Sequence, residues 1–94
     1  MEYIILSPCV TAKTCELRMR GTIELKKAEQ SLPPEADILA LTEVFLSVAY
    51  KGKPFSLYQS GKIVVKDAES AEAKVLLKEM LALLDKKGCL VAKD

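Results

Sequence analysis

The last third of the chain contains the sequence feature that most constrains the fold. Between residues 70 and 88, apolar residues recur at intervals of three and four, which is the spacing of a helix with one buried face. Ser70 is a favourable N-cap residue, and Gly88 suits the position just after a helix. The pattern predicts a long amphipathic helix, which needs an apolar surface to cover. Its apolar stripe consists of Ala73, Leu76, Leu77, Met80, Leu83 and Leu84.

The residues before this helix predict the sheet that it covers. Residues 54–66 place β-branched and aromatic residues on both sides of a turn at residues 59–62, which is typical of a β-hairpin. Residues 44–51 predict a third strand. Residues 15–20 alternate strictly between apolar and polar side chains, as in a half-buried strand. We therefore expect a mostly antiparallel sheet.

Three further segments complete the predicted order of elements. A short helix is expected over residues 22–28, and it should stop before residues 32–34 because proline cannot continue a helix. Residues 3–6 predict an edge strand, joined to the next strand by a turn at Ser7–Pro8. Residues 37–42 fit either a helical turn or an extended lead into the following strand. Together the elements predict an α+β fold, an antiparallel sheet with helices packed on one face and the other face open.

Length and composition indicate one folded domain over residues 1–94. Half of the residues are hydrophobic and 29% are charged, which is typical of a globular protein. No apolar run approaches the roughly 20 residues that span a bilayer, and the acidic N-terminus is unlike a secretory signal. We therefore expect a cytoplasmic protein that does not contact membranes. Because the three cysteines have no paired spacing, we expect buried thiols and neither a disulfide framework nor a zinc site at Cys9, Cys15 and Cys89.

The chain lacks the residues and motifs of common enzymes. It contains no histidine, the most frequent general base and metal ligand. The glycine-rich nucleotide-binding motifs, the serine-nucleophile motif and the metalloprotease motif are all absent. The sequence of residues 60–62 is similar to the end of a phosphate-binding loop, but it lies in a predicted hairpin turn and lacks the upstream glycine. We predict a non-enzymatic binding protein with no catalytic residue, no metal and no cofactor.

Period-two alternation separates the two faces of the predicted sheet. The face towards the helices would be apolar, with Cys15, Leu17, Met19, Phe55, Leu57, Ile63 and Val65. The open face would carry Glu16, Arg18, Arg20, Phe45, Ser47, Ala49, Lys51, Ser56, Tyr58, Val64 and Lys66. Four bases and one acid give this face a balance of +3, although the whole chain has a net charge of +1. Such a mixture of bases and aromatic rings suits contact with nucleic acid, whereas a merely solvated face also carries Lys and Arg.

Part of the chain resembles one repeat of the TATA-box-binding protein family. The segment Tyr58–Val65, followed by Asp67–Ser70 and the predicted long helix, is similar to the family's Phe-Ser-Ser-Gly-Lys strand, its next strand and its second helix start. Ile23–Lys27 is similar to the family's Leu-Asp-Leu-Lys-Lys at the first helix. The resemblance covers residues 13–90 and leaves residues 1–12 as an N-terminal extension or edge strand. It implies the β-α-β-β-β-β-α half of that fold, with the helices on the convex face.

The same resemblance implies a function. In that family the open, saddle-shaped sheet binds the DNA minor groove, and phenylalanine wedges kink the duplex. Tyr58 matches one wedge position, while the second falls near Thr42 or Val44, close to Phe45. The family's saddle consists of two repeats and this chain contains one, so a homodimer would be needed to restore it.

Three hypotheses about function stay open from the sequence. The first is a nucleic-acid- or transcription-associated module that binds DNA or RNA through its open face. Its candidate binding residues are Arg18, Arg20, Lys51 and Lys66 for phosphates, and Phe45 and Tyr58 for bases. The second is a protein-interaction or adaptor module that holds a polypeptide on the sheet face or edge, which the near-neutral net charge favours. The third is a small-ligand pocket between the sheet and the long helix.

Overall fold

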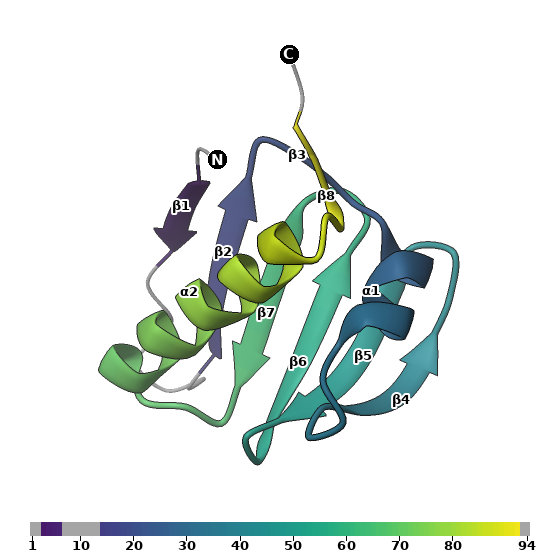
Figure 1. The fold of residues 1–94 in the computed structure, drawn as a ribbon. Coiled ribbons are helices and arrows are strands. Elements are labelled where there is room, and N and C mark those ends of the chain that lie inside the picture. The colour runs from purple at the N-terminus through teal and green to yellow at the C-terminus, as the bar shows by residue number, and fades with distance from the viewer. Residues whose placement is uncertain (1–2, 7–13, 93–94) are drawn as a thin grey trace.

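The described part of the chain contains a six-stranded antiparallel sheet and two helices (Figure 1). The computed structural model describes residues 3–6 and 14–92. In sheet order the strands are β1 (Tyr3–Leu6), β2 (Thr14–Met19), β7 (Lys62–Lys66), β6 (Lys53–Tyr58), β5 (Phe45–Tyr50) and β4 (Asp37–Leu41). The expected α+β class is confirmed, as are the edge strand at residues 3–6 and the hairpin formed by β6 and β7.

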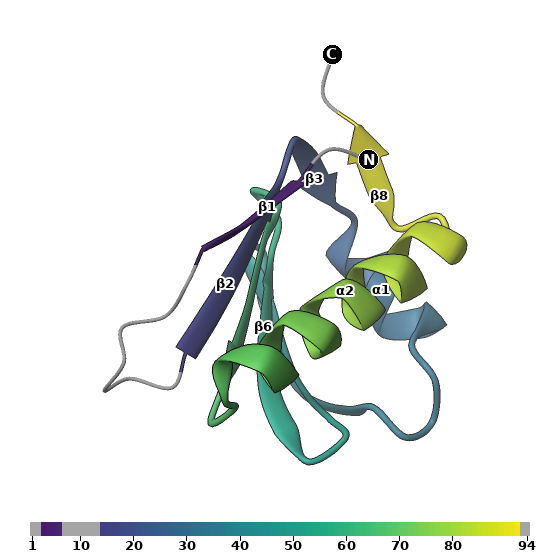
Figure 2. The same cartoon turned by 90° about the vertical axis from the view of Figure 1, so that its left-hand side faces the viewer.

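Both helices lie against the same face of the sheet (Figure 2). Helix α2 (Ser70–Lys86) packs on β2 and β7, and α1 (Leu25–Ser31) packs on β4 and β5. Between these layers lies the core, whose largest fully buried side chains include Phe55, Leu57, Leu77 and Met80. Because strand side chains alternate, the residues between these buried positions point to the other face, which no described element covers.

Helix α2 forms as its sequence pattern predicts. It begins at Ser70, so the N-cap position is Glu69, one residue earlier than predicted. At its C-terminus, Gly88 has a φ of 73° and donates its N–H to Asp85 at 3.0 Å, while the Cys89 N–H reaches the Leu84 carbonyl at 2.8 Å. These two bonds make a Schellman cap, which ends the helix and turns the chain back towards the sheet. Among the described residues, no helix is long and apolar enough to cross a membrane.

A small second sheet changes the predicted start of the first helix. The residues predicted to open that helix form β3 (Gly21–Ile23), which pairs antiparallel with β8 (Leu90–Ala92). The Glu24 N–H donates to the Cys89 carbonyl at 2.7 Å, so the helix begins only at Leu25. The prediction of a helix over residues 22–28 was therefore wrong at its N-terminal end. A three-residue strand whose partner lies at the far end of the chain has no local sequence signature.

Of residues 37–42, which the sequence left ambiguous, Asp37–Leu41 form the edge strand β4. It pairs with β5, and the register shifts between Ile38 and Ala40, so Leu39 is the extra residue of a β-bulge. Four strands therefore lie between the two helices, one more than the residue patterns alone predicted. The turn predicted at Ser7–Pro8 and the thiol of Cys9 lie outside the described residues.

Gly61 fixes the hairpin of β6 and β7 against the end of β2. Its carbonyl accepts the Met19 N–H at 2.9 Å, and its φ is 97°. A Cβ at this position would lie 2.5 Å from the carbonyl oxygen of Gly21 and 3.0 Å from that of Met19. Both contacts are with backbone, so neither can be relieved by moving a side chain.

We predict that Gly61→Ala lowers the free energy of unfolding by about 3 kcal/mol, because it combines left-handed backbone strain with a steric clash. Gly52→Ala is the matched control, since Gly52 has a φ of 76° and open space where the Cβ would be. That variant should cost only about 1 kcal/mol. Urea unfolding measures both, and equal losses would show that the close approach at Gly61 is unimportant.

Candidate nucleic-acid interface

One row of side chains crosses the open face at the end of the sheet nearest the β6–β7 turn. The strand register sets Arg18 opposite Lys62, Lys62 opposite Tyr58, and Tyr58 opposite Phe45. Residues directly opposite each other in an antiparallel ladder point to the same face, so these four side chains form a continuous row over four strands. We call these four residues the basic–aromatic row.

The members of the basic–aromatic row contact one another. The rings of Phe45 and Tyr58 have centroids 6.0 Å apart and are tilted by 38°. The Lys62 ammonium lies 4.6 Å from the Tyr58 ring centroid, within the range of a cation–π contact. The Arg18 guanidinium pairs with the Glu16 carboxylate at 2.5 Å, and its side chain stays 60% exposed. The row therefore combines two accessible cations with two partly exposed rings.

The neighbouring row of the same face carries uncharged side chains on β7, β6, β5 and β4. Val64 lies opposite Ser56, Ser56 lies opposite Ser47, and Ser47 lies opposite Ala40. Val64 is only 8% exposed, although it lies on the open face opposite Ser56. These four positions carry no charge, in contrast to the basic–aromatic row.

Most of the predicted binding residues lie on the open face, but not all of them join the row. Arg18, Phe45 and Tyr58 belong to it, while Lys66 lies at the other end of β7, opposite Thr14. Arg20 is exposed and lies one residue beyond the end of β2, outside the ladder that fixes the row.

Lys62 is the binding candidate that the sequence analysis missed. It was assigned to the hairpin turn, although it lies two residues before Val64, which was correctly placed on the open face. Period-two counting back from Val64 was the signal that would have found it.

The assignment of Lys51 to the open face was wrong. Its ammonium bonds to the Glu79 carboxylate at 2.7 Å, and Glu79 is part of α2 on the helix-covered side. Lys51 has a φ of 53° in the turn after β5, so the strand alternation does not continue through it. The hydrogen bond that Lys51 donates to the Glu79 carboxylate raises the pKa of Lys51 above its usual range and ties this base to the helix.

These placements change the charge balance of the open face. The described ladder gives it Arg18, Lys62 and Lys66 as bases. Its acids are Glu16 and Asp37, the second because β4 adds it opposite Ala49. The result for the ladder is +1, whereas the predicted +3 also counted Arg20, beyond the end of β2, and Lys51. Two of the three bases of the ladder lie in the basic–aromatic row, and Lys66 lies at the other end of β7.

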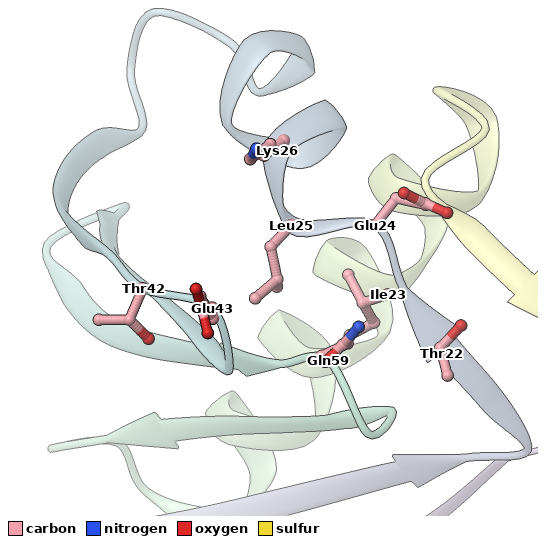
Figure 3. A pocket seen from close by; sticks show the side chains of 8 residues that line it. All are labelled: Thr22, Ile23, Glu24, Leu25, Lys26, Thr42, Glu43 and Gln59. Carbon is pink, nitrogen blue, oxygen red and sulfur yellow. The ribbon is translucent and has the colours of Figure 1, made fainter.

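A pocket lies on the helix side, at the N-terminal end of α1 (Figure 3). Its volume is about 270 Å³, and it is lined by Thr22, Ile23, Glu24, Leu25, Lys26, Thr42, Glu43 and Gln59. The buried Ile23 and Leu25 supply apolar wall, while two carboxylates and one ammonium lie around it. The pocket adjoins the short helix, whereas the sequence hypothesis placed a ligand pocket beside the long one.

No protein-family model matches the chain, and the comparisons with curated proteins and with solved structures give no match. The comparisons therefore add nothing to the sequence resemblance to the TATA-box-binding protein family.

Cys15 and Cys89 are both buried, as expected for structural thiols. Burial raises the pKa of the Cys89 thiol above its ordinary value of 9.0, against the smaller lowering effects of a Ser31 hydrogen bond and the Lys27 charge. Within the part of the chain that the structure describes, no three His, Cys, Asp or Glu side chains group as metal ligands.

We predict that iodoacetamide alkylates Cys89 at least roughly tenfold more slowly in the native protein than in urea at pH 8, because the thiolate is the nucleophile and the fold disfavours it. Since the folded pKa is raised, the neutral thiol predominates at this pH and the difference should shrink as the pH passes the thiol pKa. Mass spectrometry of the peptide containing Cys89 gives the rate. Equal native and unfolded rates would contradict the burial of this thiol.

Proposed function

We propose that this chain is a non-enzymatic module that binds single-stranded nucleic acid through the basic–aromatic row. Arg18 and Lys62 would contact phosphates, and Tyr58 and Phe45 would stack on bases. The observation that carries the proposal is the alignment of two cations and two rings in one ladder row, with Lys62 already over the Tyr58 ring. Stacking on aromatic side chains beside basic residues is the common mode of single-strand recognition.

The distribution of charge favours a single strand over a duplex. Two cations at one end of the face suit a short stretch of backbone, whereas duplex binding by shape and charge usually engages many phosphates over a broad surface. Bases stack on protein rings only when they are unstacked from their neighbours, which a single strand allows at little cost. Tyr58, with its hydroxyl group, also suits stacking better than insertion between paired bases.

The resemblance to the TATA-box-binding protein family supports a role for the same face. From β2 to α2 the elements follow each other as strand, short helix, four strands and long helix, apart from the added β3. This is the order that the resemblance implies. In that family the open sheet face is the DNA-binding surface, so the proposal assigns function to the corresponding face. A homodimer that restores a two-fold saddle belongs to this same proposal, and a cytoplasmic location remains an expectation.

We predict that Arg18→Gln combined with Lys62→Gln weakens binding of a fluorescent single-stranded oligonucleotide and flattens its salt dependence. Loss of two phosphate contacts should reduce the slope of log K against log salt concentration by roughly 1.4. Fluorescence anisotropy from about 50 to 200 mM salt measures both quantities. The corresponding duplex, tested in parallel, should bind more weakly.

Lys74→Gln combined with Lys78→Gln is the matched control, because it removes the same charge from the exposed side of α2. This control should bind almost as tightly as the unmodified protein. Equal losses in both double variants would show that only net charge matters. Absence of binding at the lowest salt would remove the proposed function.

A further inference from the structure

The outer edge of β4 presents an apolar strand that no other described strand pairs. β4 ends the sheet order, with β5 on its inner side. Ile38 is 37% exposed, Leu39 is 61% exposed at the bulge, and Val44 just beyond the strand is 60% exposed. Unpaired backbone groups on an edge strand can accept an additional strand from another polypeptide. The edge therefore offers both backbone hydrogen bonds and apolar contacts.

Acidic residues surround this edge strand. Glu35, Asp37 and Glu43 are all exposed, and residues 35–44 contain no base. Lys51, which lies close enough to Glu35 for an electrostatic interaction, is held by Glu79 on α2. The edge is therefore apolar along its length and negative at both ends.

This charge pattern argues against a second copy of the chain as the occupant. Antiparallel pairing of two β4 strands would bring Glu35 and Asp37 of one copy beside Glu43 of the other. Parallel pairing would bring each acid beside its own counterpart. Like charges placed opposite each other in a ladder are destabilising, and the in-register pairing in either orientation contains such pairs. A strand with basic ends has no such conflict.

The pocket beside α1 begins where β4 ends. The first two residues after β4, Thr42 and Glu43, line this pocket together with the apolar side chains of Ile23 and Leu25 (Figure 3). A lysine or arginine side chain could lay its aliphatic stem on this apolar wall and hold its charge near Glu43. Glu24 and Glu43 together outnumber Lys26, the one base that lines the pocket. The pocket thus offers a place for a basic residue at one end of an added strand.

We infer that the β4 edge binds an extended polypeptide segment that has apolar residues in its middle and lysine or arginine at its ends. The partner adds a strand outside β4 and places a basic side chain next to Glu43. This surface is separate from the basic–aromatic row, because β4 lies at the sheet edge and the row ends at Phe45 of β5. The inference stands without the proposed nucleic-acid function.

The test uses the full chain, labelled with ¹⁵N, and a synthetic heptapeptide that alternates valine and threonine and carries lysine at both ends. NMR titration should give saturable shifts at the amides of Asp37–Leu41, with a dissociation constant below about 1 mM. A peptide with glutamate at both ends should bind at least about tenfold more weakly, because its charges oppose those of the edge. Comparable affinity for both peptides would overturn the inference, as would shifts confined to other elements.

Leu39→Lys should abolish binding of the basic peptide, because a lysine on an edge strand opposes strand addition. Val75→Lys is the matched control, since Val75 on α2 is 60% exposed and the substitution adds the same charge. It should leave binding intact, as should Arg18→Gln with Lys62→Gln. Equal loss in Leu39→Lys and Val75→Lys would overturn the inference. Dimerisation in light scattering that Leu39→Lys abolishes would also overturn it, in favour of a second copy.

Discussion

Burial of a single sheet face under two helices is the constraint on which the rest of this structure depends. The apolar side chains of the central strands must all meet α1 and α2, so the register of each strand is fixed to within a residue, because a slip of one residue would exchange the faces. The same condition decides what the open face carries. Leu17, Leu57 and Ile63 are fully buried on one side, and their neighbours Arg18, Tyr58 and Lys62 therefore share the other.

Sequence reasoning predicted those parts of the fold that local patterns determine. The spacing of apolar residues predicted α2, and alternation predicted β2 and the hairpin. Both patterns predicted a sheet with one covered face. It failed where a distant partner decides the local structure. Gly21–Ile23 is a strand because Leu90–Ala92 returns beside it, and residues 37–41 are extended because β5 offers an edge. Propensity over a few residues cannot reveal such partners.

The candidate site, like the fold, was predictable where it depends on alternation within one strand. Arg18, Phe45 and Tyr58 follow from alternation within their strands, and the structure aligns them in one row with Lys62. Lys51 was misplaced because alternation stops at a residue with positive φ, and its charge is bound to Glu79 across the turn. Pairing between strands, which decides that Lys62 lies beside Tyr58, requires a register that a single sequence does not contain. The positively charged part of the open face is therefore narrower in the structure than the sequence predicted.

Photocrosslinking can show whether the basic–aromatic row contacts nucleic acid bases. A single-stranded oligonucleotide that contains 5-bromouracil is irradiated with the protein, and the attached residue is found by mass spectrometry. We expect attachment at Tyr58 or Phe45, whose ring centroids lie 6.0 Å apart on the open face. Attachment mainly to α2, on the opposite side of the sheet, would contradict it.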